Sequence, residues 1–430
     1  MSEVPADEPL SDLDALLWAV DDPRHRTTIA ALARVDGRVD HDELGRRVDR
    51  TSRAVPRLRQ RVTADASGRA MWTTDPAFDP DRHLDVVTVP DSSDDALARL
   101  VRDRVAQPLD RERPLWELTL VEGPPGDDCA LLVTAHHAIS DGVGGVAMMA
   151  ALFDLDLDPD LDPDLGPGIA VEPVSREQSR QDPPPSITDR AWRLGETLGA
   201  AYRVLRPSEG EAVVAPARSA ELDLRFLSLD LDDLRAAGAR VGGTINTAFL
   251  TAVAIGLADH AAMTGRTPLR IGVPVSTRTH DCETGNYWSP TRIDVTLAAG
   301  AEPDSVAARL VADSARLRGD PIHELLPLAA AGLRLLPEQA AAAVFRAVSA
   351  GADVAASNVP GCPFPLRLCG RPVRELIPFG PLSGTAVNVT LLSYAGVAHI
   401  GIASDPAAIT DPDALARDLR HAFTAVVKGS

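Results

Sequence analysis

Residues 134–145 read TAHHAISDGVGG, and this stretch carries the strongest indication of fold and function in the chain. The apolar run 129–133 before it predicts a strand, and the apolar residues 146–153 after it predict the start of a buried helix. Two adjacent histidines, His136 and His137, therefore stand where a strand passes into a helix. A junction of this kind presents side chains to a cleft more readily than a core does.

The residue types in this stretch suit proton transfer, because the unperturbed pKa of histidine is about 6.5. Asp141 follows His137 by four residues and can orient a histidine ring, brace the loop through an arginine or cap the next helix. Gly142 and the glycines after it allow a tight turn and the close approach of a ligand. The stretch alone leaves two interpretations open, a reactive site or a pair of loop histidines beside a helix cap.

Length and composition restrict the classes of function. A chain of 430 residues with 45% hydrophobic residues predicts a globular protein of two or three domains. Its net charge of -19 argues against a nucleic-acid partner and against strong electrostatic attraction to an anionic membrane. No apolar run reaches the roughly 18 residues that a membrane span needs. The four irregularly spaced cysteines predict reduced thiols, so we expect a cytoplasmic protein.

An acidic stretch marks the predicted domain boundary. Residues 154–164 alternate aspartate with leucine or proline, and a proline-rich segment follows at 181–185. The spacing lacks the glycine and terminal glutamate of an EF-hand loop, so we predict a solvated linker and no metal site. The chain then divides into a first domain at 1–153, a linker at 154–187 and a second domain at 188–430. Interleaved strands and helices predict the α/β (α+β) class with mixed sheets.

The pattern predicts the following elements. Helices are expected at 10–18, 41–53, 94–105, 146–153, 188–205, 230–240, 244–262, 304–317, 323–350 with a break at Pro337, and 412–427; strands are expected at 28–35, 84–89, 118–121, 129–133, 222–229, 269–276, 387–394 and 397–403. Trp116 follows two prolines and offers either a core anchor or a cleft wall. Asn246, in the first turn of a predicted helix, faces either the backbone or the cleft.

Taken in order, the motifs resemble those of the bacterial wax ester synthase/diacylglycerol acyltransferase family. This family belongs to the HHxxxDG acyltransferases, which include chloramphenicol acetyltransferase and the condensation domains of nonribosomal peptide synthetases. The matching motifs are LSDLDALLW (10–18), PLDRERPLWELTLVEG (108–123), HHAISDG (136–142), VPVSTR (273–278) with a later GN (285–286), SNVPG (357–361), PLSG (381–384), SYAG (393–396) and DPDALARDL (411–419).

The resemblance implies two chloramphenicol-acetyltransferase-like domains with a tunnel between them. It implies that His137 is the general base, that His136 supports the site, and that Asp141 is structural with Arg278 as its candidate partner. The further substrate-binding or supporting residues expected from it are Gly142, Trp116, Asn246, Arg278 and Ser383. Two departures stand out: Asn246-Thr247 replaces the family's Asn-Asp pair, and Arg26-Thr27-Thr28 replaces a Met-His near the first strand.

The function implied by the resemblance is transfer of a fatty acyl group from acyl-CoA to a long-chain alcohol or diacylglycerol. A thiol with a pKa near 8.5 leaves with little acid help, and no GxSxG elbow surrounds a serine, so we expect direct transfer without a resident cofactor. Contact with a membrane surface or lipid droplet would suit such acceptors. Two alternatives remain: an acyltransferase with a carrier-bound donor or a non-lipid acceptor, and a non-catalytic lipid-binding protein.

Overall fold

The computed structural model describes residues 7–124, 128–154, 218–261, 268–277, 285–297, 301–318, 332–333, 336–349 and 351–429. Several predictions fall outside these residues. They are the linker after Asp154, the helix 188–205, the first part of the helix 323–350, and Arg278.

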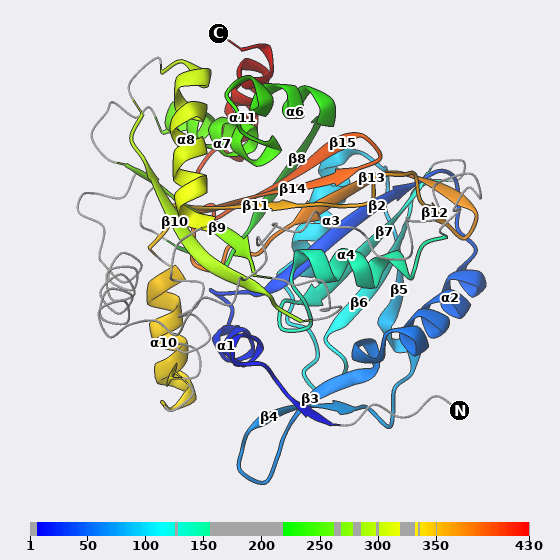
Figure 1. Ribbon diagram of the computed structural model, residues 1–430. Coiled ribbons are helices and arrows are strands. Elements are labelled where there is room, and N and C mark those ends of the chain that lie inside the picture. The colour runs from blue at the N-terminus through cyan, green and yellow to red at the C-terminus, as the bar shows by residue number, and fades with distance from the viewer. Residues whose placement is uncertain are drawn as a thin grey trace, which may run out of the picture.

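Two six-stranded sheets form the framework of the molecule (Figure 1). The first has the order β12 (Arg367–Leu368), β13 (Arg371–Phe379), β2 (Thr28–Val35), β7 (Cys129–His136), β6 (Trp116–Glu122), β5 (Leu84–Thr88), and the second has the order β10 (Trp288–Val295), β9 (Leu269–Ser276), β11 (Val354–Val359), β14 (Val387–Tyr394), β15 (Val397–Ser404), β8 (Asp223–Asp230). Each sheet is mixed, because β5 is parallel to β6 and β11 is parallel to both β9 and β14. The predicted fold class is confirmed.

The first sheet is completed by a segment from far along the chain. Strand β13 pairs antiparallel with β2, with Phe379 opposite Ala30 and Leu376 opposite Ala33. The predicted division at residues 153 and 188 assigned this segment to the second domain, whereas the structure places it in the first sheet. The physical reason is that β2 offers a row of backbone groups on the side away from β7, and β13 satisfies them.

Four helices surround the first sheet: α1 (Asp12–Val20), α2 (His41–Ala54), α3 (Asp94–Val105) and α4 (Gly142–Ala150). Ser11 caps α1 by accepting a hydrogen bond from the backbone N–H of Asp14 at 3.1 Å, one of the two caps predicted. Helix α4 begins four residues before the predicted start, because Asp141 caps it. A small sheet of β1 (Glu8–Pro9), β4 (Ala70–Thr74) and β3 (Gln60–Ala64) lies beside α1, and the short helices η1 (Pro56–Arg59) and η2 (Pro80–His83) connect the strands.

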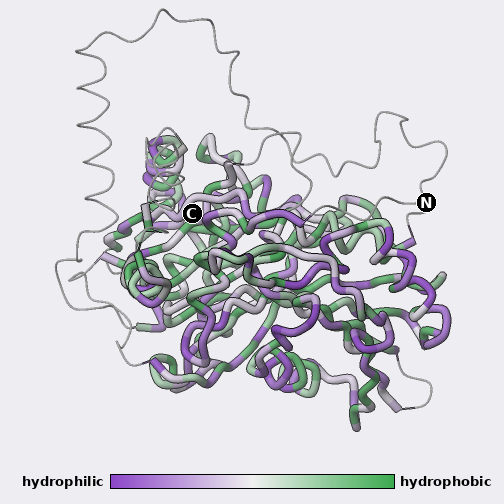
Figure 2. The backbone as a smooth tube through the Cα atoms, turned by 90° about the horizontal axis from the view of Figure 1, so that it is seen from below, coloured by the Kyte–Doolittle hydropathy of each residue, from purple (hydrophilic) through white to green (hydrophobic). Residues whose placement is uncertain are grey.

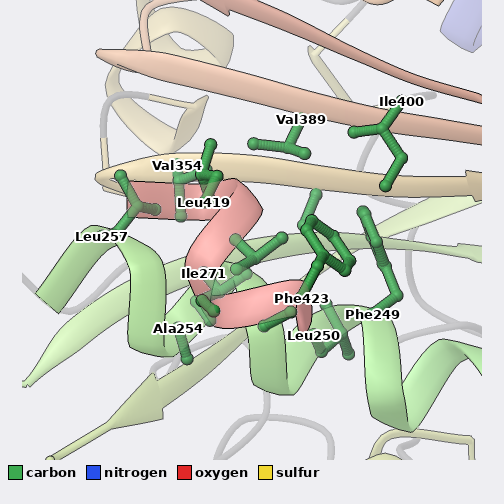
Figure 3. Packing of buried hydrophobic residues seen from close by; sticks show 14 of the residues in the cluster. Phe249, Leu250, Ala254, Leu257, Ile271, Val354, Val389, Ile400, Leu419 and Phe423 are labelled. Carbon is green, nitrogen blue, oxygen red and sulfur yellow. The ribbon is translucent and has the colours of Figure 1, made fainter. Parts of the chain in front are cut away.

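The core of the second half lies between its sheet and two long helices, α7 (Ile245–His260) and α11 (Pro412–Lys428). Figure 3 shows Phe249 of α7 and Phe423 of α11 side by side beneath the strands, with ring centroids 6.2 Å apart. Helices α6 (Leu231–Arg240) and α8 (Pro303–Arg318) pack against α7. Along most elements in Figure 2 the colour alternates between hydrophilic and hydrophobic, as expected for elements with one buried face.

Helix α10 (Glu338–Ser349) lies beside α1 (Figure 1), where Ala341 and Phe345 pack against Leu16. This contact brings the second half of the chain against the first helix. Within the described residues no single helix has the length and apolarity to cross a bilayer. Only α6 and α7 taken together meet that criterion, and they are bent by 90° at their junction.

Candidate active site

The end of strand β7 positions the two histidines. His136 is the last residue of β7 and lies opposite Thr28 of β2, and the backbone N–H of His137 donates to the carbonyl of Thr27 at 2.9 Å. A turn follows at once, because the N–H of Ile139 donates to the carbonyl of His136. Neighbouring residues of a strand point to opposite faces, so the two rings enter different surroundings.

The His136 ring is buried in the first half of the molecule, with 2% of the residue exposed. Its Nδ1 accepts a hydrogen bond from the N–H of Ala138 at 3.0 Å, so the ring hydrogen is on Nε2, which lies 2.9 Å from the hydroxyl of Thr27. Burial lowers the pKa of His136 to about 4, although the carboxylate of Asp21 opposes this shift. His136 is therefore neutral at pH 7 and has no lone pair free for proton transfer.

The His137 ring is held from the other half of the molecule. Its Nδ1 lies 2.8 Å from the Oδ1 of Asn286, which also accepts from the indole N–H of Trp288 at 3.2 Å. The Nδ2 of Asn286 donates to Asp14 at 2.7 Å and to the carbonyl of His137 at 2.6 Å. These partners fix which end of the Asn286 amide faces the ring, so Nδ1 of His137 carries a hydrogen, and in the neutral form of the ring the lone pair is on Nε2.

Asp141 joins the histidine loop to both halves of the molecule. One carboxylate oxygen caps α4 by accepting from the N–H of Gly144 at 2.9 Å, and the other accepts from the N–H of Tyr287 at 3.0 Å. The N–H of Asp141 in turn donates to the carbonyl of Gly285. Asp141 thus holds the loop, as its predicted structural role requires. Two of its partners are backbone amides, and its predicted partner Arg278 lies outside the described residues.

Gly142 allows α4 to approach the second sheet closely. A Cβ atom at this position would lie 2.8 Å from Cγ2 of Val359, the last residue of β11. Real Cβ atoms essentially never lie so close to another heavy atom. The glycine of the HHAISDG motif and the valine of the SNVPG motif are therefore in close contact across the two halves.

A cavity of about 400 Å³ lies between the two halves and is lined by His137. From the first half its walls are mostly apolar, including Val48, Leu118, Val133, Met149 and Phe153. From the second half the walls carry more polar groups, including Ser357, Asn388 and Thr390. The tunnel predicted between two domains has its counterpart in this cavity, where His137 faces a mostly apolar lining that carries polar groups on the side of the second half.

Two further predicted residues, Trp116 and Ser383, also line the cavity. The indole N–H of Trp116 donates to the carbonyl of Leu58 at 2.8 Å, and its ring stacks on His83 with centroids 4.3 Å apart. Trp116 is thus both a core anchor and a cavity wall, the two alternatives that its sequence left open. Ser383 has a φ of 47°, in the left-handed region, and precedes Gly384 at 90°.

Asn246 lies in the first turn of α7 and does not line the cavity as the described residues define it. Among the described residues, no contact links Asn246 to the cavity as its predicted supporting role would require. Its neighbour Thr247 accepts a hydrogen bond from the N–H of Thr244 at 3.2 Å, so the threonine that replaces the family's aspartate stabilises the start of the helix.

The sequence did not identify Asn286 and Asp14 as site residues. Both stood inside quoted motifs, GN and LSDLDALLW, but 272 positions separate them and no local pattern connects them. The sequence offers two aspartates, Asp12 and Asp14, in the first turn of this helix and no signal that separates them. Among the described residues, no group of three or more His, Cys, Asp or Glu side chains is arranged to hold a metal ion.

Comparison with known proteins agrees with this geometry. The catalytic-domain model of the wax ester synthase/diacylglycerol acyltransferase family matches residues 10–249, and its C-terminal domain model matches 315–426. A putative diacylglycerol O-acyltransferase of Mycobacterium tuberculosis is 30% identical over 94% of this chain and 88% of its own length. A second one from that organism, described as probable and named tgs1, is 29% identical over 97% of this chain and 95% of its own.

Solved structures show the same fold at lower identity. The wax ester synthase/diacylglycerol acyltransferase of Marinobacter aquaeolei VT8 superposes with a TM-score of 0.65 at 19% identity, covering 97% of this chain and 98% of the other. The first condensation domain of the CDA synthetase superposes with a TM-score of 0.63 at 17% identity, covering 99% and 98%. With these matches over nearly its whole length, the chain belongs to the wax ester synthase/diacylglycerol acyltransferase family and is an acyltransferase.

Proposed function

We propose that the protein transfers a fatty acyl group from coenzyme A to the hydroxyl of a long-chain alcohol or a diacylglycerol, with His137 as the general base. The observation that carries this proposal is the hydrogen bond from Nδ1 of His137 to Asn286, which assigns the lone pair of the neutral ring to Nε2 in a residue that lines the cavity. A neutral imidazole with a free Nε2 is the form that accepts a proton from a hydroxyl.

The reaction follows in two steps. Nε2 of His137 takes the proton of the acceptor hydroxyl while the hydroxyl oxygen attacks the carbonyl carbon of the thioester. The tetrahedral intermediate then collapses, the C–S bond breaks, and the leaving thiolate takes the proton from Nε2. The products are an ester and free coenzyme A, and His137 returns to its neutral form. These two steps balance in atoms and protons without an acyl-enzyme or a resident cofactor.

The tetrahedral oxyanion needs a hydrogen-bond donor, and Ser140 supplies one in this proposal. Ser140 lines the cavity three residues after His137 and is 2% exposed. Its hydroxyl has no hydrogen-bond partner within the described residues. A buried hydroxyl without a partner costs free energy, and a preorganised donor of this kind gains its partner when the oxyanion forms.

The two walls of the cavity suit the two parts of the substrates. An alkyl chain gains about 0.8 kcal/mol for each buried CH₂ group, so the apolar wall beside Val48, Leu118 and Phe153 favours the acyl chain. The polar side chains of Ser357 and Asn388 favour the amide-rich arm of the acyl carrier.

Release of coenzyme A tests this function directly. We expect turnover of palmitoyl-CoA with hexadecanol or with diacylglycerol, and loss of turnover when His137 is replaced by alanine. If neither lipid acceptor supports coenzyme A release, the lipid function is wrong. Repeating the assay with the acyl group on a carrier protein and with a short-chain alcohol then tests the two alternatives.

A further inference from the structure

We propose that Asp14 is a positioning residue that sets the tautomer of His137 through the side-chain amide of Asn286. This inference rests on the proposed role of His137 as the base. The three residues come from α1, from the loop before β10 and from the end of β7, and they meet in one chain of hydrogen bonds from Asp14 to Asn286 to His137.

The argument begins with what Asn286 would do without Asp14. A side-chain amide has a donor end and an acceptor end of nearly equal size, and rotation by 180° exchanges them. With Nδ2 toward the ring, Nδ1 of His137 would have to accept, the hydrogen would move to Nε2, and the base would lose its lone pair. The catalytic state therefore depends on which end of the Asn286 amide faces the ring.

Asp14 contributes to this choice because its Oδ1 accepts a hydrogen bond from Nδ2 of Asn286. It lies 2.7 Å from Nδ2 of Asn286, so the acceptor end of the amide is directed to His137. Two other groups act in the same sense: the carbonyl of His137 accepts from Nδ2, and the indole N–H of Trp288 donates to Oδ1. The amide has partners at both ends, and Asp14 is the charged one.

The carboxylate of Asp14 is well shielded from water, with 4% of the residue exposed. Ser11 at the cap of α1 also bonds to this carboxylate. Among the charged groups that face it, Arg57 of η1 is close enough to lower its pKa, and Arg57 itself pairs with Glu8 of β1 at 2.6 Å. Burial has the larger effect and raises the pKa of Asp14. A negative charge held in such surroundings also favours the imidazolium that forms during turnover.

The test compares Asp14→Asn with Asp42→Asn, which replaces an exposed aspartate in the first turn of α2. An asparagine at position 14 presents either end of its own amide, so the orientation of Asn286 then depends on the carbonyl of His137 and the indole N–H of Trp288. We expect kcat/KM to fall at least tenfold in Asp14→Asn and to stay within twofold of wild type in Asp42→Asn. The apparent pKa of the base in the kcat/KM profile should also fall, because a negative charge near the ring has been removed.

A spectroscopic measurement separates the tautomer from the activity. In protein with ¹⁵N-labelled histidine, the His137 signals, assigned by their loss in His137→Ala, report which ring nitrogen carries the hydrogen. We expect Nδ1–H in the wild type and a mixture with Nε2–H in Asp14→Asn. A folded Asp14→Asn protein with wild-type activity, pH profile and tautomer would overturn the role of Asp14.

A charge swap covers the case in which Asp14→Asn fails to fold. In the double variant Asp14→Asn/Asn286→Asp the carboxylate contacts Nδ1 of His137 directly, and we expect the Nδ1–H tautomer and an apparent pKa above that of the wild type. A swapped protein that keeps Nε2–H would contradict the proposal. If His137→Ala retains activity, the proposed base is wrong. If His137→Ala is inactive while Asp14→Asn is normal, only the role of Asp14 is wrong.

Discussion

The surroundings of His136 and His137 differ more than their adjacency in the chain suggests. The ring of His136 contacts Thr27 and Ala138, both from the first half of the molecule, and burial lowers its pKa to about 4. The ring of His137 faces the cavity and is held by Asn286 and Trp288 from the second half. One histidine is buried in the core of the first half, and the other lies where the two halves meet.

This difference teaches that a repeated residue type need not share a role. The alternation of strand β7 sends consecutive side chains to opposite faces, and the packing on each face then decides the chemistry. Each prediction below concerns a residue in the surroundings of His137, in the surroundings of His136, or at the contact between the two halves.

The largest effect is expected from His137→Ala. Removing the base should lower kcat by about a hundredfold to ten-thousandfold, the usual contribution of general base catalysis, while the free energy of unfolding changes little. Coenzyme A release and urea unfolding of the same sample measure the two quantities. Turnover unchanged in a folded sample would show that His137 is not the base.

Ser140→Ala should separate activity from stability in a similar way. Loss of one preorganised donor to the oxyanion lowers kcat by about a hundredfold. Stability should stay the same or rise, because the variant removes a buried hydroxyl that has no partner within the described residues. A variant that is less stable but fully active would show that the hydroxyl is structural, and Ser67→Ala in an exposed turn serves as the control.

The third prediction concerns His136 and pH. Its pKa of about 4 in the folded protein is below the unfolded value of about 6.5. Between these two pH values the unfolded chain binds a proton at this residue and the folded chain does not. Stability is therefore lost as the pH falls, and His136 contributes about 2 kcal/mol of this loss between pH 7 and pH 5. Urea unfolding of wild type and His136→Asn at both pH values gives the difference. If wild type and His136→Asn lost the same free energy of unfolding between pH 7 and pH 5, a neutral, buried His136 would be contradicted.

The smallest effect is expected from Gly142→Ala, which tests the contact between the halves. The new Cβ would lie 2.8 Å from Cγ2 of Val359, and relieving this overlap costs about 1 kcal/mol of stability. The double variant Gly142→Ala/Val359→Ala should lose less than the sum of the single changes, because the overlap is gone. Strict additivity in unfolding measurements would argue against the contact.

Much of the fold follows from local patterns. Strands β2, β9 and β14 and helix α3 have the predicted bounds, because alternating or helical spacing of apolar residues is a local property of the chain. The cap at Ser11 and the start of α7 near Thr244 were likewise visible as sequence signals.

The strands that the sequence did not predict lack such patterns. Strand β13 reads RPVRELIPF, with two prolines and three charged residues, and it becomes a strand because β2 needs a partner. Strand β11 reads VAASNV, whose small and polar residues look like part of a turn motif. Strand β10 is an edge strand in which Pro290 lies opposite Pro274.

The site residues likewise fall into those that local motifs predict and those that only the folded structure shows. The histidines, Asp141, Trp116 and Ser383 belong to local motifs, and the structure brings them to one cavity or to its supporting loop. Asn286 and Asp14 become visible only in the folded chain, because their bond spans 272 residues. For Asn246 the motif position predicted a supporting residue of the site, but Asn246 does not line the cavity formed by the described residues.

The return of β13 to the first sheet affects how the protein emerges from the ribosome. Residues 28–136 supply strands β2, β7, β6 and β5, yet the partner of β2 is synthesised more than 200 residues later. At roughly 5–20 residues per second, the β2 edge stays open for tens of seconds during translation. We therefore expect nascent or truncated chains that end before residue 367 to bind chaperones or to aggregate through this edge. The first sheet gains this strand only after residue 379 has been synthesised.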